Sequence, residues 1–103
     1  MITSWSPAAE DGFREVAMYI LFSFGMQSWL QFEQEVYETE QRLICNPTIG
    51  KVDPLFEDCD IVYRSVLINK KSKLVYYVKD DIIFIAGFWD CRRDPVAQAK
   101  RVK

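Results

Sequence analysis

The chain has 103 residues and a formal net charge of −2, and half of its residues are hydrophobic. This length fits one compact domain over residues 1–103, and the low content of glycine and proline, four of each, excludes a low-complexity chain. Histidine is absent, which excludes Ser-His-Asp and Cys-His nucleophile systems and imidazole metal sites.

The N-terminal part is predicted to form a short strand followed by two helices. Residues 1–5 fit the strand. Ser6-Pro7 predicts a helix start, because serine caps a helix N-terminus and proline is tolerated at the first helical position. Apolar residues then recur at helical spacing up to Gly25, and a second amphipathic helix is predicted over residues 27–45. The short connection at Gly25 predicts a helical hairpin.

The rest of the chain is predicted to form a loop, three strands and a tail. Residues 46–60 lack periodicity and are expected to be a loop. Residues 61–68, 74–79 and 82–89 are rich in β-branched and aromatic side chains, and the short turns between them predict an antiparallel meander with helices on one face. Residues 82–89 are apolar on both faces, which predicts the central or best-covered strand. Residues 95–103 are expected to be a basic tail that is mobile at its end. The predicted fold class is α+β.

The sequence also predicts a location and limits the ligands. No stretch approaches the roughly 20 apolar residues of a membrane span, and the N-terminus lacks a secretory signal, so a cytoplasmic location is expected. Cys45, Cys59 and Cys91 are odd in number and far apart, which favours packing or surface roles over disulfides or a metal site. We expect no cofactor and no metal.

Charge is unevenly distributed along the chain. Residues 1–60 hold eleven acidic and three basic residues, whereas residues 61–103 hold ten basic and four acidic ones. Such asymmetry indicates either a face that binds a polyanion or a basic face covered by an acidic partner. An unevenly charged, solvated surface is the simpler alternative.

Four segments stand at the joints between the predicted elements: SWSPAAEDGFREVAMYI, NPTIGK, YRSVLINKKSKLVYYVKDD and IFIAGFWDCRRDP. Their order and spacing resemble the RelE/ParE superfamily of type II toxins over nearly the whole chain. The resemblance implies a small α+β toxin that a cognate antitoxin protein neutralises by wrapping around it.

The resemblance implies two possible modes of action. RelE-like members cut mRNA on the ribosome, whereas ParE-like members inhibit DNA gyrase and have no nuclease activity. We expect ribosome-dependent mRNA cleavage ahead of gyrase inhibition. A non-catalytic module that only binds its antitoxin is a third hypothesis.

For RelE-like cleavage, the resemblance implies lysine and arginine side chains on the sheet and after its last strand. The predicted catalytic set is Arg64, Lys73, Arg92 and Arg93. The predicted nucleic-acid-binding set is Lys70 and Lys71 in the turn and Trp89 as a stacking platform. The tyrosine that RelE-like enzymes place after the last strand has no counterpart in this sequence.

Each of these residues also has a structural interpretation. Arg64 could form an ion pair with Asp58, Asp60 or Asp90. Arg92 and Arg93 could form a salt-bridge knot with Asp90 and Asp94 that fixes the last strand. Lys70, Lys71 and Lys73 could belong to an ordinary solvated turn.

Overall fold

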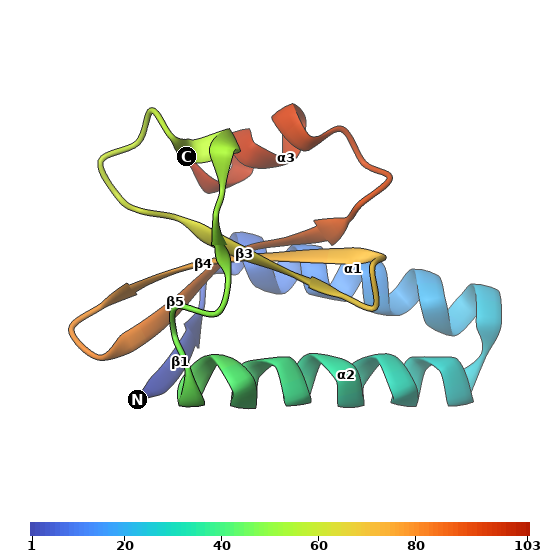
Figure 1. Ribbon diagram of the computed structural model, residues 1–103. Helices are drawn as coiled ribbons and strands as arrows, with labels where there is room; N and C mark the ends of the chain where they lie inside the picture. The colour runs from blue at the N-terminus through green and yellow to red at the C-terminus, as the bar shows by residue number, and fades with distance from the viewer.

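A computed structural model describes all of residues 1–103 (Figure 1). The elements follow the order β1 (Ile2–Trp5), α1 (Pro7–Phe24), α2 (Met26–Cys45), β2 (Lys51–Val52), the 3-10 turn η1 (Pro54–Phe56), β3 (Arg64–Ile68), β4 (Ser72–Lys79), β5 (Ile82–Asp90) and α3 (Pro95–Val102). The fold is α+β, as the sequence predicts.

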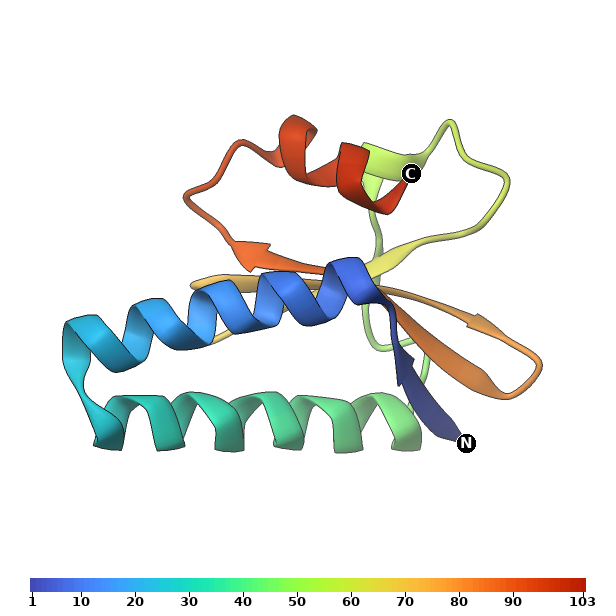
Figure 2. The same ribbon diagram turned by 180° about the vertical axis from the view of Figure 1, so that it is seen from behind.

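The five strands form one mixed sheet in the order β1-β5-β4-β3-β2. β1 runs parallel to β5, and the other neighbouring strands are antiparallel. Figures 1 and 2 show α1 and α2 on one face of the sheet and α3 with η1 on the other. No helix of the structure is both long and apolar enough to cross a membrane.

The helical hairpin forms for the reasons that the sequence suggests. The Ser6 hydroxyl accepts a hydrogen bond from the Ala9 N–H at 3.1 Å, which caps the start of α1. Gly25 separates the two helices with φ of 95°, a conformation that favours glycine. At Gly12, a Cβ atom would overlap the carbonyl oxygen of Phe88, so only glycine lets α1 approach β5 this closely.

Each face of the sheet has its own core. The α1–α2 face buries Leu74, Tyr76 and Phe88 against the two helices. The α3 face buries Val75, Trp89 and Ala99, with Phe56 and Tyr63 beside them. Alternation of side chains along β4 and β5 assigns neighbouring residues to opposite faces.

Several sequence predictions need correction. The first meander strand begins at Arg64 rather than Ile61, and the expected loop over residues 46–60 contains β2 and η1. Helices cover both faces of the sheet rather than one. The expected tail forms α3, because the Asp94 carboxylate accepts a hydrogen bond from the Val96 N–H at 3.0 Å and Pro95 starts the helix. Ala99 is buried against the sheet, which holds this helix in place.

Candidate functional site

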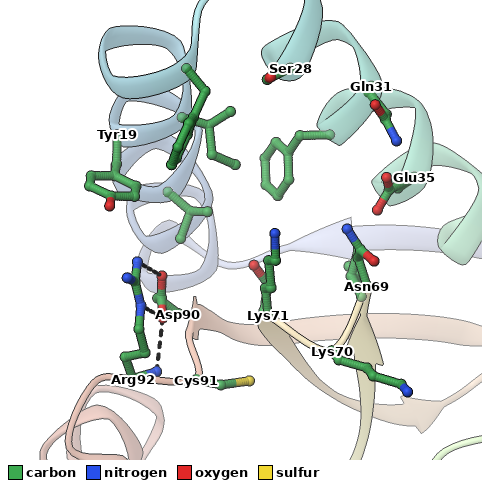
Figure 3. Close-up of a pocket in the computed structure, with 16 residues that line it drawn as sticks. Tyr19, Ser28, Gln31, Glu35, Asn69, Lys70, Lys71, Asp90, Cys91 and Arg92 are labelled. Atoms are coloured by element: carbon green, nitrogen blue, oxygen red, sulfur yellow. Dashed lines mark hydrogen bonds and ion pairs between the residues drawn. The ribbon is translucent and has the colours of Figure 1, made fainter.

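A cleft of about 500 Å³ opens between the α1–α2 hairpin, the β3–β4 turn and the end of β5 (Figure 3). Apolar side chains of both helices and of β3 form much of its wall, namely Val16, Ile20, Phe24, Phe32 and Ile68. Hydrogen-bonding side chains lie among them, namely Ser28, Gln31, Glu35 and Asn69. The cleft therefore combines apolar walls with a few polar groups, as binding sites generally do.

The β3–β4 turn brings two predicted lysines to this cleft. Asn69 and Lys70 both have positive φ, 51° and 58°, and the Lys71 N–H donates to the Ile68 carbonyl at 3.1 Å. This geometry is that of a type I′ turn. Figure 3 shows the Lys71 side chain pointing into the cleft and the Lys70 side chain pointing away from it. Neither lysine has an ion-pair partner in the structure, so Lys71 is the free cation inside the cleft.

Arg92 lies at the rim of the cleft, where Asp90 holds it. Its Nε and Nη2 donate to the Asp90 carboxylate at 3.0 and 2.8 Å, and its guanidinium lies 5.4 Å from the centre of the Tyr19 ring. These hydrogen bonds from Arg92 lower the pKa of Asp90, although burial opposes them. The same carboxylate raises the pKa of Arg92. Much of the Arg92 charge is therefore balanced locally.

Arg93 lies next to the cleft rather than in it. Its Nη2 is 3.8 Å from Glu15 of α1, and Arg101 of α3 approaches the same carboxylate at 3.6 Å. The expected salt-bridge knot thus consists of Asp90 with Arg92, while Arg93 pairs with α1 and Asp94 caps α3.

Lys73 lies on the α3 face of the sheet, opposite to the face that borders the cleft. It belongs to β4 rather than to the turn, and only 20% of its side chain is exposed. Its ammonium faces the Asp53 carboxylate at 2.5 Å and lies 5.6 Å from the Trp89 ring centre. Burial alone would raise the pKa of Asp53, but hydrogen bonds from Lys73, the Leu55 N–H and Ser65 together lower it below its ordinary value.

Trp89 and Arg64 are both engaged within the fold. Trp89 is 5% exposed and packs in the α3-face core, so it presents no open ring face to a base. Arg64 lies on the same face of β3 as Val66 and Ile68, the face that α1 and α2 cover. Its Nη1 donates a hydrogen bond to the Gly50 carbonyl at 2.9 Å. It has no acidic partner and instead fixes the segment that leads into β2.

The predicted basic residues therefore do not form one constellation. The structure brings Lys71 and Arg92 to the cleft, with Lys70 beside it, and it separates Arg64, Lys73 and Trp89 from them. The residues that sequence reasoning missed are the polar side chains of α2 that face the cleft. A signal for them exists, since Ser28, Gln31 and Glu35 recur at helical spacing next to the buried Phe32.

Comparison with models of known protein families gives no match, and comparison with curated proteins gives none either. No group of three or more Cys, Asp or Glu side chains is placed so that it could hold a metal ion.

Proposed function

We propose that the chain is the toxin of a type II toxin–antitoxin pair, held inactive by a cognate antitoxin protein in the cytoplasm. We further propose that it inhibits growth by binding a protein target, as ParE-like toxins do with DNA gyrase, rather than by cutting mRNA on the ribosome. The sequence alone favours mRNA cleavage, whereas the positions of the basic side chains in the structure favour binding of a protein target.

The fold agrees with the toxin resemblance at each of the four segments. SWSP contains the cap and first turn of α1, NPTIGK follows α2, the third segment spans the β3–β4 hairpin, and the fourth spans β5 up to the start of α3. The proposal of a toxin rests on this agreement in order and position, together with the resemblance itself.

One observation carries the choice of mode, namely that Arg64 and Lys73 lie on opposite faces of the sheet. Scission of RNA by cationic side chains requires several of them to converge on one phosphate, where they stabilise the charge that develops. Here Lys73 is paired with Asp53 and Arg64 with the Gly50 carbonyl. The four predicted catalytic side chains therefore cannot surround one phosphodiester in this structure.

The cleft suits a protein segment better than a phosphate backbone. Its lining holds three cations, Lys70, Lys71 and Arg92, and two carboxylates, Glu35 and Asp90, so the cleft carries little net charge. Nucleic-acid sites depend mainly on uncompensated basic groups along the backbone. Apolar walls with scattered hydrogen-bonding groups accommodate side chains of a peptide or a protein loop.

The test of the mode is controlled expression of the chain in a bacterial host, with mapping of messenger ends and measurement of plasmid supercoiling. We expect growth arrest without new codon-positioned 5′ ends, and loss of negative supercoiling if gyrase is the target. Arrest with new codon-positioned 5′ ends would establish mRNA cleavage instead. Absence of arrest would remove the toxin proposal.

A matched pair of variants tests the cleft. Lys71→Glu should abolish or strongly weaken growth arrest at an unchanged melting temperature, because the side chain is exposed and makes no ion pair. Lys79→Glu makes the same charge change at the exposed end of β4, away from the cleft, and should remain toxic. Equal toxicity of the two variants would show that the cleft is not the binding site.

A further inference from the structure

A second groove, of about 580 Å³, lies between α1 and α2 on the side of the hairpin next to β1, an edge strand of the sheet. Trp5 of β1, Met18 of α1, and Trp29 and Tyr37 of α2 are among the residues that line it. Met18 is 43% exposed and Tyr37 57%, so the chain itself leaves these apolar groups uncovered. An open groove with large apolar side chains is suited to contact with another molecule.

The charged residues that line the groove are mostly acidic. Three glutamates stand against one arginine, namely Glu10, Glu33, Glu40 and Arg14. Arg14 approaches Asp11 at 3.5 Å, so part of its charge is balanced beside the groove. Residues 1–45, which include β1, α1 and α2, contain seven acidic and two basic residues, so the surroundings reinforce the negative charge. The groove is therefore complementary to a cationic partner.

The carboxylates of Glu33 and Glu40 carry charge that no cation of the chain balances. Glu40 accepts hydrogen bonds from the Thr3 hydroxyl at 3.0 Å and from the Trp5 indole N–H at 3.2 Å. Both donors are neutral, so they position this carboxylate without offsetting its charge. Glu33 is exposed and forms no ion pair in the structure. Both groups can accept hydrogen bonds from a cation that enters the groove.

Charged and apolar groups are separated along the length of the hairpin. Figure 2 shows β1 beside the start of α1 and the end of α2, which places Glu40 at this end of the groove. From Glu33 towards the connection between the helices, the exposed face of α2 continues through Leu30 and Met26, 53% and 61% exposed. Residues 16–32 contain no charged residue. The surface is thus acidic towards β1 and apolar towards the connection, over about 20 Å of α2.

We propose that this groove binds an amphipathic helix of a partner protein, with lysine or arginine side chains at one end and apolar side chains at the other. Two helices packed side by side leave a groove into which the side chains of a third can pack. The cations of the partner would lie at Glu33 and Glu40, beside the rings of Trp5 and Tyr37, whose faces also attract cations. The groove and the cleft share no lining residue, so this partner does not depend on the proposed toxin function.

The same charges disfavour two other occupants. A second copy of the chain that docks through this face would bring its own glutamates against those of the first, and like charges repel. A nucleic acid would bring a row of phosphates to the same carboxylates. A basic helix meets neither obstacle.

The test titrates the full chain with a synthetic amphipathic peptide of about 14 residues, which spans the groove as a helix. The peptide has leucines along one face, lysines at one end and no tryptophan. Binding is measured by the fluorescence of the protein, because Trp5 and Trp29 line the groove whereas Trp89 is buried on the α3 face. We expect saturable binding that weakens as salt is added. A control peptide with glutamate in place of each lysine should not bind.

Charge reversals on α2 locate the binding. Glu33→Lys should weaken binding of the lysine peptide about tenfold or more, because it places like charges together in the groove. Glu38→Lys is the matched control, since Glu38 is exposed on the same helix but does not line the groove, and this variant should bind as wild type does. Neither glutamate forms an ion pair, so both variants should fold.

Three results would overturn the proposal. The first is equal binding of the lysine and glutamate peptides, and the second is equal binding of the lysine peptide to the two charge-reversal variants. The third is no binding of the lysine peptide at all; self-association of the chain in sedimentation would then assign the groove to a second copy. None of these results depends on growth arrest, so the toxin proposal is tested separately.

Discussion

On the α3 face of the sheet, Lys73 is largely buried and faces the Asp53 carboxylate, whereas beside the other face Lys71 points into an open cleft without an ion-pair partner. The two lysines are only two residues apart in the sequence. One contributes its charge to the fold, and the other can offer it to a partner. A count of basic residues in a segment therefore does not show how many of them a ligand can reach.

Among the substitutions that test this comparison, Lys73→Met should have the largest effect on stability, because it leaves the Asp53 carboxylate buried without its cation. We expect the free energy of unfolding at neutral pH to fall by about 2 to 3 kcal/mol, measured by urea denaturation. The double variant Asp53→Asn with Lys73→Met serves as the control and should recover part of the loss. A single variant as stable as wild type would show that the pair does not stabilise the fold.

The pH dependence of the same variant follows from the lowered pKa of Asp53. A carboxylate whose pKa is lower in the folded state stabilises the protein above its unfolded pKa, and that stability is lost as the pH falls through the folded pKa. In Lys73→Met, burial dominates and raises the Asp53 pKa, so protonation relieves the penalty. The stability difference from wild type should therefore shrink as the pH falls, beginning above the ordinary aspartate pKa of about 4 and ending once the pH is below the lowered Asp53 pKa of wild type. A difference that stays constant down to acid pH would contradict this account.

Much of the fold can be predicted from local sequence, because the signals act within a few residues. Ser6-Pro7 marks the start of α1, and Gly25 marks its end, where the structure places both. Asp94-Pro95 is a signal of the same kind, but the segment after it is polar and basic, which favours a tail over a helix. The apolar pattern of residues 82–89 correctly predicts a strand covered on both faces.

The candidate site could be predicted only in part, because it depends on strand register. Leu67 pairs with Lys73 and Arg64 with Tyr76, and this pairing places Arg64 and Lys73 on opposite faces. A register irregularity between Val75 and Tyr76 shifts β4 against β5 as well. The sequence lists the basic residues, but the face that each occupies follows from pairings between distant segments.

A smaller loss of stability is expected at Asp90, whose carboxylate pairs with the exposed Arg92 at the rim of the cleft. Asp90→Asn removes the charge that balances Arg92 but keeps one oxygen that can accept from the Arg92 N–H. We expect a stability loss of about 1 kcal/mol. With its cations less balanced, the cleft should bind polyanions more tightly, so elution from a heparin column should require more salt than for wild type. Unchanged elution would show that Arg92 contributes no accessible charge in either protein.

The smallest effect on stability is expected at Lys70, where a substitution should raise the free energy of unfolding rather than lower it. Asn69 and Lys70 both adopt positive φ in the type I′ turn, where glycine fits the second central position better than lysine. Lys70→Gly should raise the free energy of unfolding by about 0.5 kcal/mol, because it relieves a left-handed conformation that disfavours a side chain. Since the Lys70 side chain points away from the cleft, growth arrest should persist. Thermal denaturation measures the first expectation and induced expression the second. Loss of arrest in a stabilised Lys70→Gly variant would show that partners contact the outer side of this turn as well as the cleft.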